Sequence, residues 1–411
     1  MVLEINRLIK YLAFIVIFSF LLPAFKIGGF GMKPDLIFLF PLLLLVLIRD
    51  TSIKKQSFFL KIFSISFLVF ISMFLSDTFG VINYGNSSGA YFPTEYIHFV
   101  NKVLILYVFY VIGKNNIISN KAFSNVITVI FFSSLIFGLF QIIGISFITG
   151  LSDKYALTEN QISKISSTNL RIFSVTGNIL TWAGWSGFIF LYTVIIYKNS
   201  ILKWVMLLLS LVNLLFTSSR GALIALAVSL LFYFMFKVYK TRKFSNLLKY
   251  IFISFISLFI IGWASFSFFE ERTILFIDRF YFLNDAIFVS GRNTQLKNIK
   301  EVFDTDIWNY FIGIGKPVID SIDLMEIEFL FILFGYGIVG VILQYSYVLL
   351  VLKKALLGLK TIYSELIIIG VLFYLIYSAG YFFLREIYSG LLFWAIIGYF
   401  LSKIDYGKYE K

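Results

Sequence analysis

The sequence predicts an all-α, polytopic integral membrane protein of about twelve transmembrane helices, with one large external loop that contains short amphipathic helices. Hydrophobic residues make up 60% of the chain and charged residues only 14%, whereas a typical soluble domain is about 25% charged. The mean hydropathy is +0.91. Apolar runs near the roughly 20 residues that cross a bilayer recur along the whole sequence. This composition excludes a soluble fold.

The apolar runs give the predicted spans. The first follows Arg7 and Lys10 and resembles a signal sequence, but no small-residue cleavage site comes after it, so we expect an uncleaved span. The seventh and eighth runs are joined by little more than Ser218-Ser219-Arg220-Gly221, and one hairpin entering from outside is the alternative for that pair. The predicted spans are 8–25, 34–48, 57–76, 97–113, 123–148, 176–197, 202–217, 219–236, 250–268, 326–351, 363–381 and 388–402.

The basic residues predict the orientation of these spans. Lysines dominate one set of short loops, such as 49–55 and 237–249, and short basic loops normally stay in the cytoplasm. Both termini are then cytoplasmic. The net charge of +13 lies mainly in loops, so we expect contacts with membrane lipids rather than nucleic acid. Arginines gather on the external side, and they are Arg171, Arg220, Arg272, Arg279, Arg292 and Arg385.

The chain divides into three parts. Residues 1–268 hold the first nine spans, residues 269–325 form the large external loop, and residues 326–411 hold the last three spans and a cytoplasmic tail. Within the loop, residues 272–283 are aromatic, basic and suited to lie on the bilayer surface. An amphipathic helix is predicted to open after Ser290-Gly291-Arg292, because apolar residues then recur at helical spacing. These residues are Leu296, Ile299, Val302 and Phe303.

Arg220 is the strongest candidate for a functional residue. It opens an apolar run on the external side, where a basic residue in a membrane helix marks a candidate functional site. Its Ser-Ser-Arg-Gly context predicts a helix N-terminus, whose free N–H groups and positive dipole end attract anions. The guanidinium group is a planar fork suited to bidentate contacts with phosphate. The alternative is an arginine that only anchors a helix end.

Three further arginines are candidates for the same phosphate site. Arg171 precedes Gly177-Asn178 at the start of another span, and Arg292 opens the loop helix. Contact with lipid headgroups is the alternative for Arg171, and a solvated charge is the alternative for Arg292. Arg385 adjoins Glu386 between the last two spans, where a structural ion pair is the favoured interpretation.

Glu326 is the candidate general base, with Glu328 beside it at the external end of the tenth span. An acid that complements a helix dipole is an equally good interpretation. Asp304-Thr305-Asp306 resembles the metal motif of sugar-nucleotide transferases, but nucleotide sugars are absent on the external side, so we expect no metal there. His98 is the sole histidine and cysteine is absent, which excludes the usual His and Cys metal sites.

In their order along the chain, these segments resemble the O-antigen polymerase and ligase superfamily, the Wzy-type bacterial polysaccharide polymerases. The resemblance covers most of the chain from about residue 170. Its pieces are Arg171 to Gly177-Asn178, Thr217-Ser218-Ser219-Arg220-Gly221, Ser290-Gly291-Arg292, Gly313-Ile314-Gly315, and Glu326 to Gly337-Ile338-Val339-Gly340.

The resemblance implies a metal-independent membrane glycosyltransferase without cofactors, at the periplasmic face of the bacterial inner membrane. Such enzymes transfer the growing glycan from undecaprenyl pyrophosphate to a new undecaprenyl-pyrophosphate-linked repeat unit. The family also implies a chain-length regulator protein as a partner. Arg220, Arg292 and Glu326 would then be catalytic. The pyrophosphate would be bound by Arg171, Arg220, Arg292 and Arg385.

Two departures from the family pattern bear on function. After Gly177-Asn178 the chain has Ile179-Leu180, where many relatives carry Pro-Asn. Ligase-type relatives carry a histidine in the large loop, whereas this loop has none and Glu326 falls near that place. This favours a polymerase over its closest alternative, an O-antigen ligase that transfers the glycan to a lipid A core. The alternative from another class is a lipid-linked oligosaccharide flippase, but no internal repeat predicts two similar halves.

Overall fold

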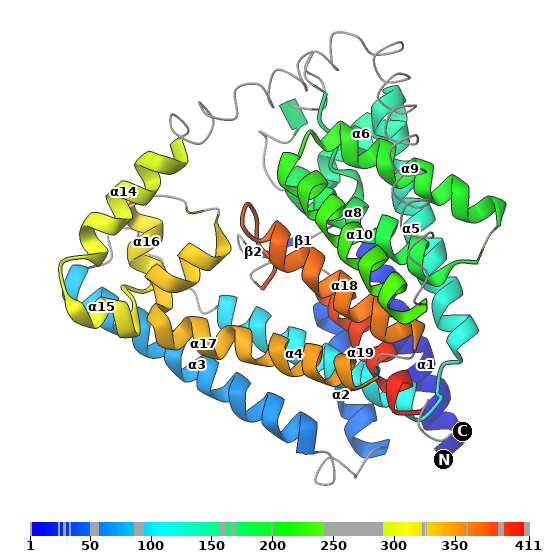
Figure 1. Ribbon diagram of the computed structural model, residues 1–411, viewed down its shortest axis with the longest axis horizontal. Helices are drawn as coiled ribbons and strands as arrows, with labels where there is room; N and C mark the ends of the chain where they lie inside the picture. The colour runs from blue at the N-terminus through cyan, green and yellow to red at the C-terminus, as the bar shows by residue number, and fades with distance from the viewer. Residues whose placement is uncertain are drawn as a thin grey trace.

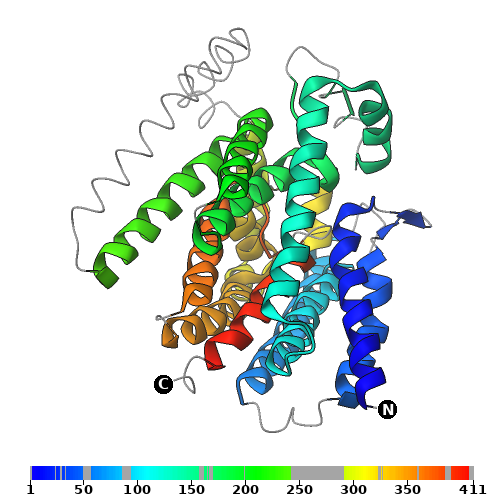
Figure 2. The ribbon, with the colours of Figure 1, turned by 90° about the vertical axis from the view of Figure 1, so that its right-hand side faces the viewer.

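The computed structural model is a set of packed helices with one short β-hairpin near the N-terminus (Figure 1, Figure 2). The structure describes residues 2–23, 25–27, 30–32, 34–49, 57–85, 94–156, 162–163, 165, 170–198, 200–241, 291–322, 325, 327–358, 361–384 and 390–406. The hairpin pairs β1 (Phe25–Ile27) with β2 (Phe30–Met32) in antiparallel register. It is a small addition to the predicted all-α architecture.

The helices follow one another along most of the described chain. In the first part they are α1 (Val2–Phe18), α2 (Pro34–Arg49), α3 (Ser57–Tyr84), α4 (Thr94–Lys114), α5 (Asn120–Ile143), α6 (Ser146–Tyr155), α8 (Ile179–Ile196), α9 (Ile201–Thr217) and α10 (Arg220–Thr241). In the second part they are α14 (Gly291–Phe303), α15 (Ile307–Ile312), α16 (Lys316–Ile322), α17 (Glu328–Leu357), α18 (Ile362–Tyr377) and α19 (Gly390–Tyr406). Two 3-10 turns are η1 (Ser19–Leu21) and η3 (Ser174–Thr176).

The described helices have the length and composition of a helical membrane protein, as the sequence predicts. Five of them, within α3, α5, α8, α10 and α17, are long and apolar enough to cross a membrane. Shorter apolar helices lie within α2, α9, α18 and α19. The ninth predicted span, 250–268, lies outside the described residues. The count of twelve spans therefore stays a prediction.

Some helices end at other residues than the predicted spans, each for a local reason. The fifth span was predicted to reach residue 148, but α5 ends at Ile143 because Gly144 takes a left-handed φ of 78°. The third was predicted to end at 76, but α3 continues to Tyr84 and packs against α15 and α16. The eleventh was predicted to reach 381, but α18 ends at Tyr377 and residues 378–384 are not helical.

One end of the bundle is rich in lysines that bind carbonyl and carboxylate groups, and we call it the lysine end. Lys403 Nζ donates to the Gly113 carbonyl at 2.6 Å. Lys237 and Lys240 lie 3.1 and 2.9 Å from the carboxylate of Glu365, which joins α10 to α18. The start of α1 and the end of α19 lie at this end (Figure 2). The starts of α8 and α10 and the end of α18 lie at the opposite end.

Helix α17 is broken at Gly337, whose φ of 64° and ψ of −172° are not helical. Backbone N–H groups from the segment between α15 and α16 bond to the carbonyls that the break leaves free. The Ile314 N–H donates to the Phe334 carbonyl at 2.8 Å, and the Gly315 N–H donates to the Gly335 carbonyl at 2.9 Å. A helix break inside a membrane protein is tolerated where neighbouring groups satisfy the freed carbonyls in this way.

The same segment also docks on α3. The Ser76 hydroxyl donates to the Ile312 carbonyl, and the Lys316 N–H donates to Asp77 Oδ1 at 2.7 Å. Gly313 has a left-handed φ of 89°, which favours glycine. The Gly-Ile-Gly segment and the later glycines of α17 thus form one joint between residues 291–322 and the helix bundle.

The amphipathic helix that the sequence predicts within residues 269–325 is confirmed as α14. Ile299 and Phe303 are buried on its inner side, and Leu296 and Val302 are half-buried beside them. Helix α14 packs against α16 and α17 (Figure 1). The predicted surface segment 272–283 lies outside the described residues.

Candidate functional site

Residues 171–178 form a largely buried segment without α-helix among α5, α8 and α9, and it contains the 3-10 turn η3. The N–H groups of Phe173 and Ser174 donate to Oε1 of Gln141, at 3.3 and 2.8 Å. The Ser174 hydroxyl donates to the Ser134 carbonyl at 2.6 Å, and Ser174 itself has a positive φ of 47°. Irregular backbone in a membrane protein persists only where protein or a cavity surrounds it. Here the Gln141 side chain accepts two of the backbone N–H groups.

Asn178 ends segment 171–178 and caps α8. Its Oδ1 accepts the N–H groups of Leu180 at 2.8 Å and Thr181 at 3.3 Å. Gly177 before it has a left-handed φ of 72°, which lets the chain turn into the helix. The Gly-Asn pair therefore fixes where α8 begins.

The structure brings Arg171 and Arg220 to the same turn. This turn is Thr217-Ser218-Ser219, between the end of α9 and the start of α10, and Ser218 takes a left-handed φ of 53°. Nε of Arg171 donates to the Thr217 carbonyl at 2.9 Å. Arg220 is the first residue of α10, and both arginines are half-buried. We call Arg171 with residues 217–220 the arginine turn.

The arginine turn places two cationic residues at the N-terminus of a long helix. The first N–H groups of a helix have no acceptor within it, and they carry its positive dipole end. Together with guanidinium groups, such an end is suited to bind a phosphate or pyrophosphate group.

Tyr377, the last residue of α18, connects the arginine turn to an aromatic pocket. Its hydroxyl donates to the Leu180 carbonyl at 2.8 Å and lies 3.4 Å from the Ser219 hydroxyl. A Cβ added to Gly221 would lie 3.7 Å from the Tyr377 ring, so the first turn of α10 packs directly on that ring.

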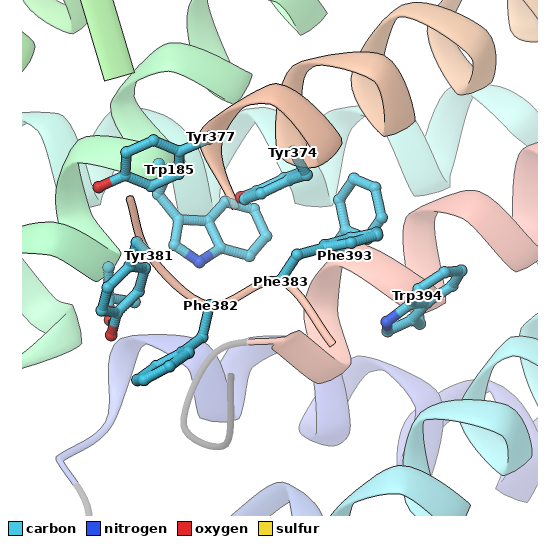
Figure 3. A pocket seen from close by; sticks show the side chains of 10 residues that line it. Trp185, Tyr374, Tyr377, Tyr381, Phe382, Phe383, Phe393 and Trp394 are labelled. Atoms are coloured by element: carbon cyan, nitrogen blue, oxygen red, sulfur yellow. The ribbon is translucent and has the colours of Figure 1, made fainter. Parts of the chain in front are cut away.

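The pocket lies among α8, α18, α19 and residues 378–384, and it encloses about 320 Å³, counting the part that is open to the surroundings. Trp185, Tyr374, Tyr377, Phe383 and Phe393 are among the aromatic residues that line it (Figure 3). The polar groups in the pocket lining include the hydroxyls of Thr181 and Tyr381, which lie 2.6 Å apart. A lining of this kind suits a mostly apolar group with few polar contacts.

Two buried ionisable residues hold the pocket wall at residues 383–384. Oε2 of Glu328 accepts the N–H groups of Phe383 and, at 2.6 Å, Leu384. Nζ of Lys102, from α4, donates to the Leu384 carbonyl. Both side chains are almost fully buried, at 0% exposure for Glu328 and 1% for Lys102. Charged groups at such depth are costly and mark functional or tightly positioned sites.

The structure describes the remaining predicted site residues only in part or not at all. Glu326 and Arg385 lie outside the described residues. Arg292 is described only by its backbone, as the second residue of α14, and Figure 1 shows α14 apart from α9 and α10. The structure therefore unites Arg171 with Arg220 and does not show Arg292 at the arginine turn.

The Asp-x-Asp segment has local structural roles. Asp306 caps α15 by accepting the Trp308 N–H at 3.0 Å. Asp304 accepts the Tyr310 hydroxyl at 2.7 Å, and this hydrogen bond raises the pKa of Tyr310. Among the described residues, no group of three or more His, Cys, Asp and Glu side chains is placed to hold a metal ion.

The residues that support the site were not predicted from the sequence. Gln141 and Lys102 are polar residues inside predicted spans, and that position is itself a signal of a function or a packed contact. Tyr377 and the other pocket rings gave no such signal, because the chain has 25 Tyr and 51 Phe and most of them have no special role.

Comparison with models of known protein families finds no match, and comparison with curated proteins finds none either.

Proposed function

We propose that this protein is an O-antigen or polysaccharide polymerase, a membrane glycosyltransferase that uses a polyprenyl-pyrophosphate donor at the periplasmic side of the bacterial inner membrane. The observation that supports this function best is the arginine turn, where Arg171 and Arg220 lie at the N-terminus of α10. The resemblance of the segments around these residues to the Wzy-type polymerases supplies the reaction class.

In the proposed reaction, a hydroxyl oxygen of the acceptor repeat unit forms a bond to the anomeric carbon of the donor glycan. The bond between that carbon and a pyrophosphate oxygen breaks, and its electron pair leaves with the pyrophosphate. The proton of the hydroxyl passes to a base, for which Glu326 is the candidate. Negative charge grows on the leaving pyrophosphate, and positive groups already in place there lower the barrier. The arginine turn would supply these groups.

The aromatic pocket fits the same substrate. It is joined to the arginine turn through Tyr377, so a pyrophosphate at the turn would have its attached apolar chain close to the pocket. The first isoprene units of such a chain would contact the aromatic rings that line the pocket in Figure 3. The proposal therefore places the charged and apolar parts of one lipid-linked substrate against two adjoining surfaces.

The test is polymerisation by the purified protein in nanodiscs, with undecaprenyl-pyrophosphate-linked repeat units as the only substrate. Products are separated on a gel. The wild type should give a ladder, and Arg220→Ala should lower the rate by about 10²- to 10³-fold, the usual effect of removing one group that stabilises developing charge. Arg220→Lys keeps the charge but loses the planar fork, so its rate should lie between the two.

Arg49→Ala is the matched control. Arg49 ends α2 and binds Asn6 Oδ1 at 3.1 Å, away from the arginine turn, so its loss should leave the ladder unchanged. A folded wild type that makes no ladder would refute the polymerase. Transfer of a finished glycan to added lipid A core would then support the ligase, and movement of the lipid-linked unit across a vesicle membrane would support the flippase.

A further inference from the structure

Helix α15 exposes large apolar side chains and buries a polar one. Ile307, Trp308 and Phe311 are 70%, 56% and 49% exposed, whereas Asn309 is fully buried. The Asn309 side-chain amide donates to the Tyr84 hydroxyl at 2.8 Å, which fixes the polar face against the protein. A helix that borders water shows the opposite arrangement, with its apolar face inward. The outer face of α15 therefore matches an apolar surrounding.

The depth of α15 along the bundle indicates what that surrounding is. It contacts α3 at Ser76, whose hydroxyl binds the Ile312 carbonyl, and it contacts α17 at the Gly337 break. From the start of α3 to Ser76 the chain has about 20 residues, or about 30 Å at 1.5 Å per residue. From Gly337 to the end of α17 the length is about 31 Å. Both lengths equal the roughly 30 Å hydrocarbon thickness of a bilayer.

Exposed apolar residues also stand close in sequence to both contact points, Gly337 of α17 and Ser76 of α3. Ile338 and Ile342 of α17 are 44% and 60% exposed, and Phe74 and Leu75 of α3 are 49% and 55% exposed. They lie on the sides of helices that are long and apolar enough to cross a membrane. Exposed apolar side chains therefore flank, in the sequence, the two positions where α15 contacts these helices.

We propose that α15 is an interfacial helix whose Ile307, Trp308 and Phe311 contact the acyl chains and headgroups of the lipids, at the membrane boundary opposite the lysine end. Helices of this kind bury an apolar face about 5–10 Å into that boundary, and tryptophan is favoured there. The contact ties residues 291–322 to the bilayer surface. This inference does not depend on the proposed enzymatic function.

The test uses the absence of cysteine from the chain. Single cysteines replace Ile307, Trp308 and Phe311 in the full-length protein, and Lys297 and Glu301, which are exposed on α14, in matched controls. Each variant carries a nitroxide spin label and is placed, one copy per particle, in phosphatidylcholine–phosphatidylglycerol nanodiscs. Power saturation then measures collisions of each label with oxygen, which concentrates in lipid, and with a water-soluble nickel complex.

We expect the three α15 labels to collide more with oxygen than with nickel, and the two α14 labels to show the reverse order. Nickel collisions at the α15 labels as frequent as at the controls would mean that this face meets water, and the proposal would be wrong. Low collision rates with both reagents would mean that protein covers the face, which also overturns it. A drop in both rates only when several copies share a membrane would identify a second copy as the partner instead.

Discussion

Replacing Glu328 should loosen one wall of the aromatic pocket by an amount that the structure allows to be worked out. In Glu328→Ala the N–H groups of Phe383 and Leu384 lose the oxygen that accepts both. Each buried N–H left without an acceptor costs about 1–3 kcal/mol, so the pair should cost about 2–6 kcal/mol of unfolding free energy. This is a large fraction of the stability of an ordinary folded protein, which is about 5–15 kcal/mol.

Glu328→Gln separates the loss of charge from the loss of the acceptor. A glutamine carbonyl oxygen can occupy the place of Oε2 and accept both N–H groups, but without charge assistance, which about halves the strength of each bond. We therefore expect the glutamine variant to lose about half as much stability as the alanine variant. The unfolding free energy is measured by titration with sodium dodecyl sulfate in mixed micelles, with Glu301→Ala on the exposed side of α14 as the control.

Two results would refute this reasoning. An alanine variant as stable as the wild type would mean that the two N–H groups find other acceptors. A glutamine variant as unstable as the alanine variant would mean that the charge of Glu328, and not its acceptor oxygen, holds residues 383–384.

Two further predictions concern the backbone of the joint and of the site. Gly313→Ala should destabilise the protein more than Gly85→Ala in the same titration. Both glycines have positive φ values, 89° and 77°, but the ψ of 172° places Gly313 in a region that essentially only glycine adopts, where strain is about 1–3 kcal/mol. Only the Gly313 Cβ would overlap the Gly335 carbonyl, and equal losses would show that the joint yields. Gln141→Leu should abolish the ladder and destabilise the protein by about 2–6 kcal/mol, because the N–H groups of Phe173 and Ser174 lose their acceptor. Gln141→Glu keeps that acceptor and should retain measurable polymerisation, so equal activity in the two variants would contradict the role of Gln141.

The sequence predicted the architecture well wherever hydrophobicity alone decides it. Most predicted spans correspond to a described helix, and the loop helix at Leu296 to Phe303 was recognised from its spacing. Boundaries were less predictable because they depend on distant contacts. Helix α18 stops at Tyr377, and the backbone beyond it is held by Glu328 and Lys102 from other helices. No local pattern around Tyr377 encodes that arrangement.

The candidate site was predicted only in part. Arg171 and Arg220 were selected separately, from position and residue type, and their meeting depends on the bond between Arg171 and the Thr217 carbonyl. The pocket could not be predicted, because its rings come from three helices and from the non-helical residues 381–383, and aromatic residues are common throughout the chain. The glycines at 313 and 337 were recognised as a pattern, but their physical reason, a shared backbone joint, required the fold.

The joint between α3 and residues 312–316 has a consequence for how the chain is made. The bond from the Lys316 N–H to Asp77 Oδ1 connects residues 239 positions apart. At synthesis rates of about 5–20 residues per second, Asp77 is made about 10–50 s before its partner. During that interval the last third of α3 carries a carboxylate without this backbone donor. The contact between α3 and residues 312–316 therefore forms late, only after residues 312–316 leave the ribosome.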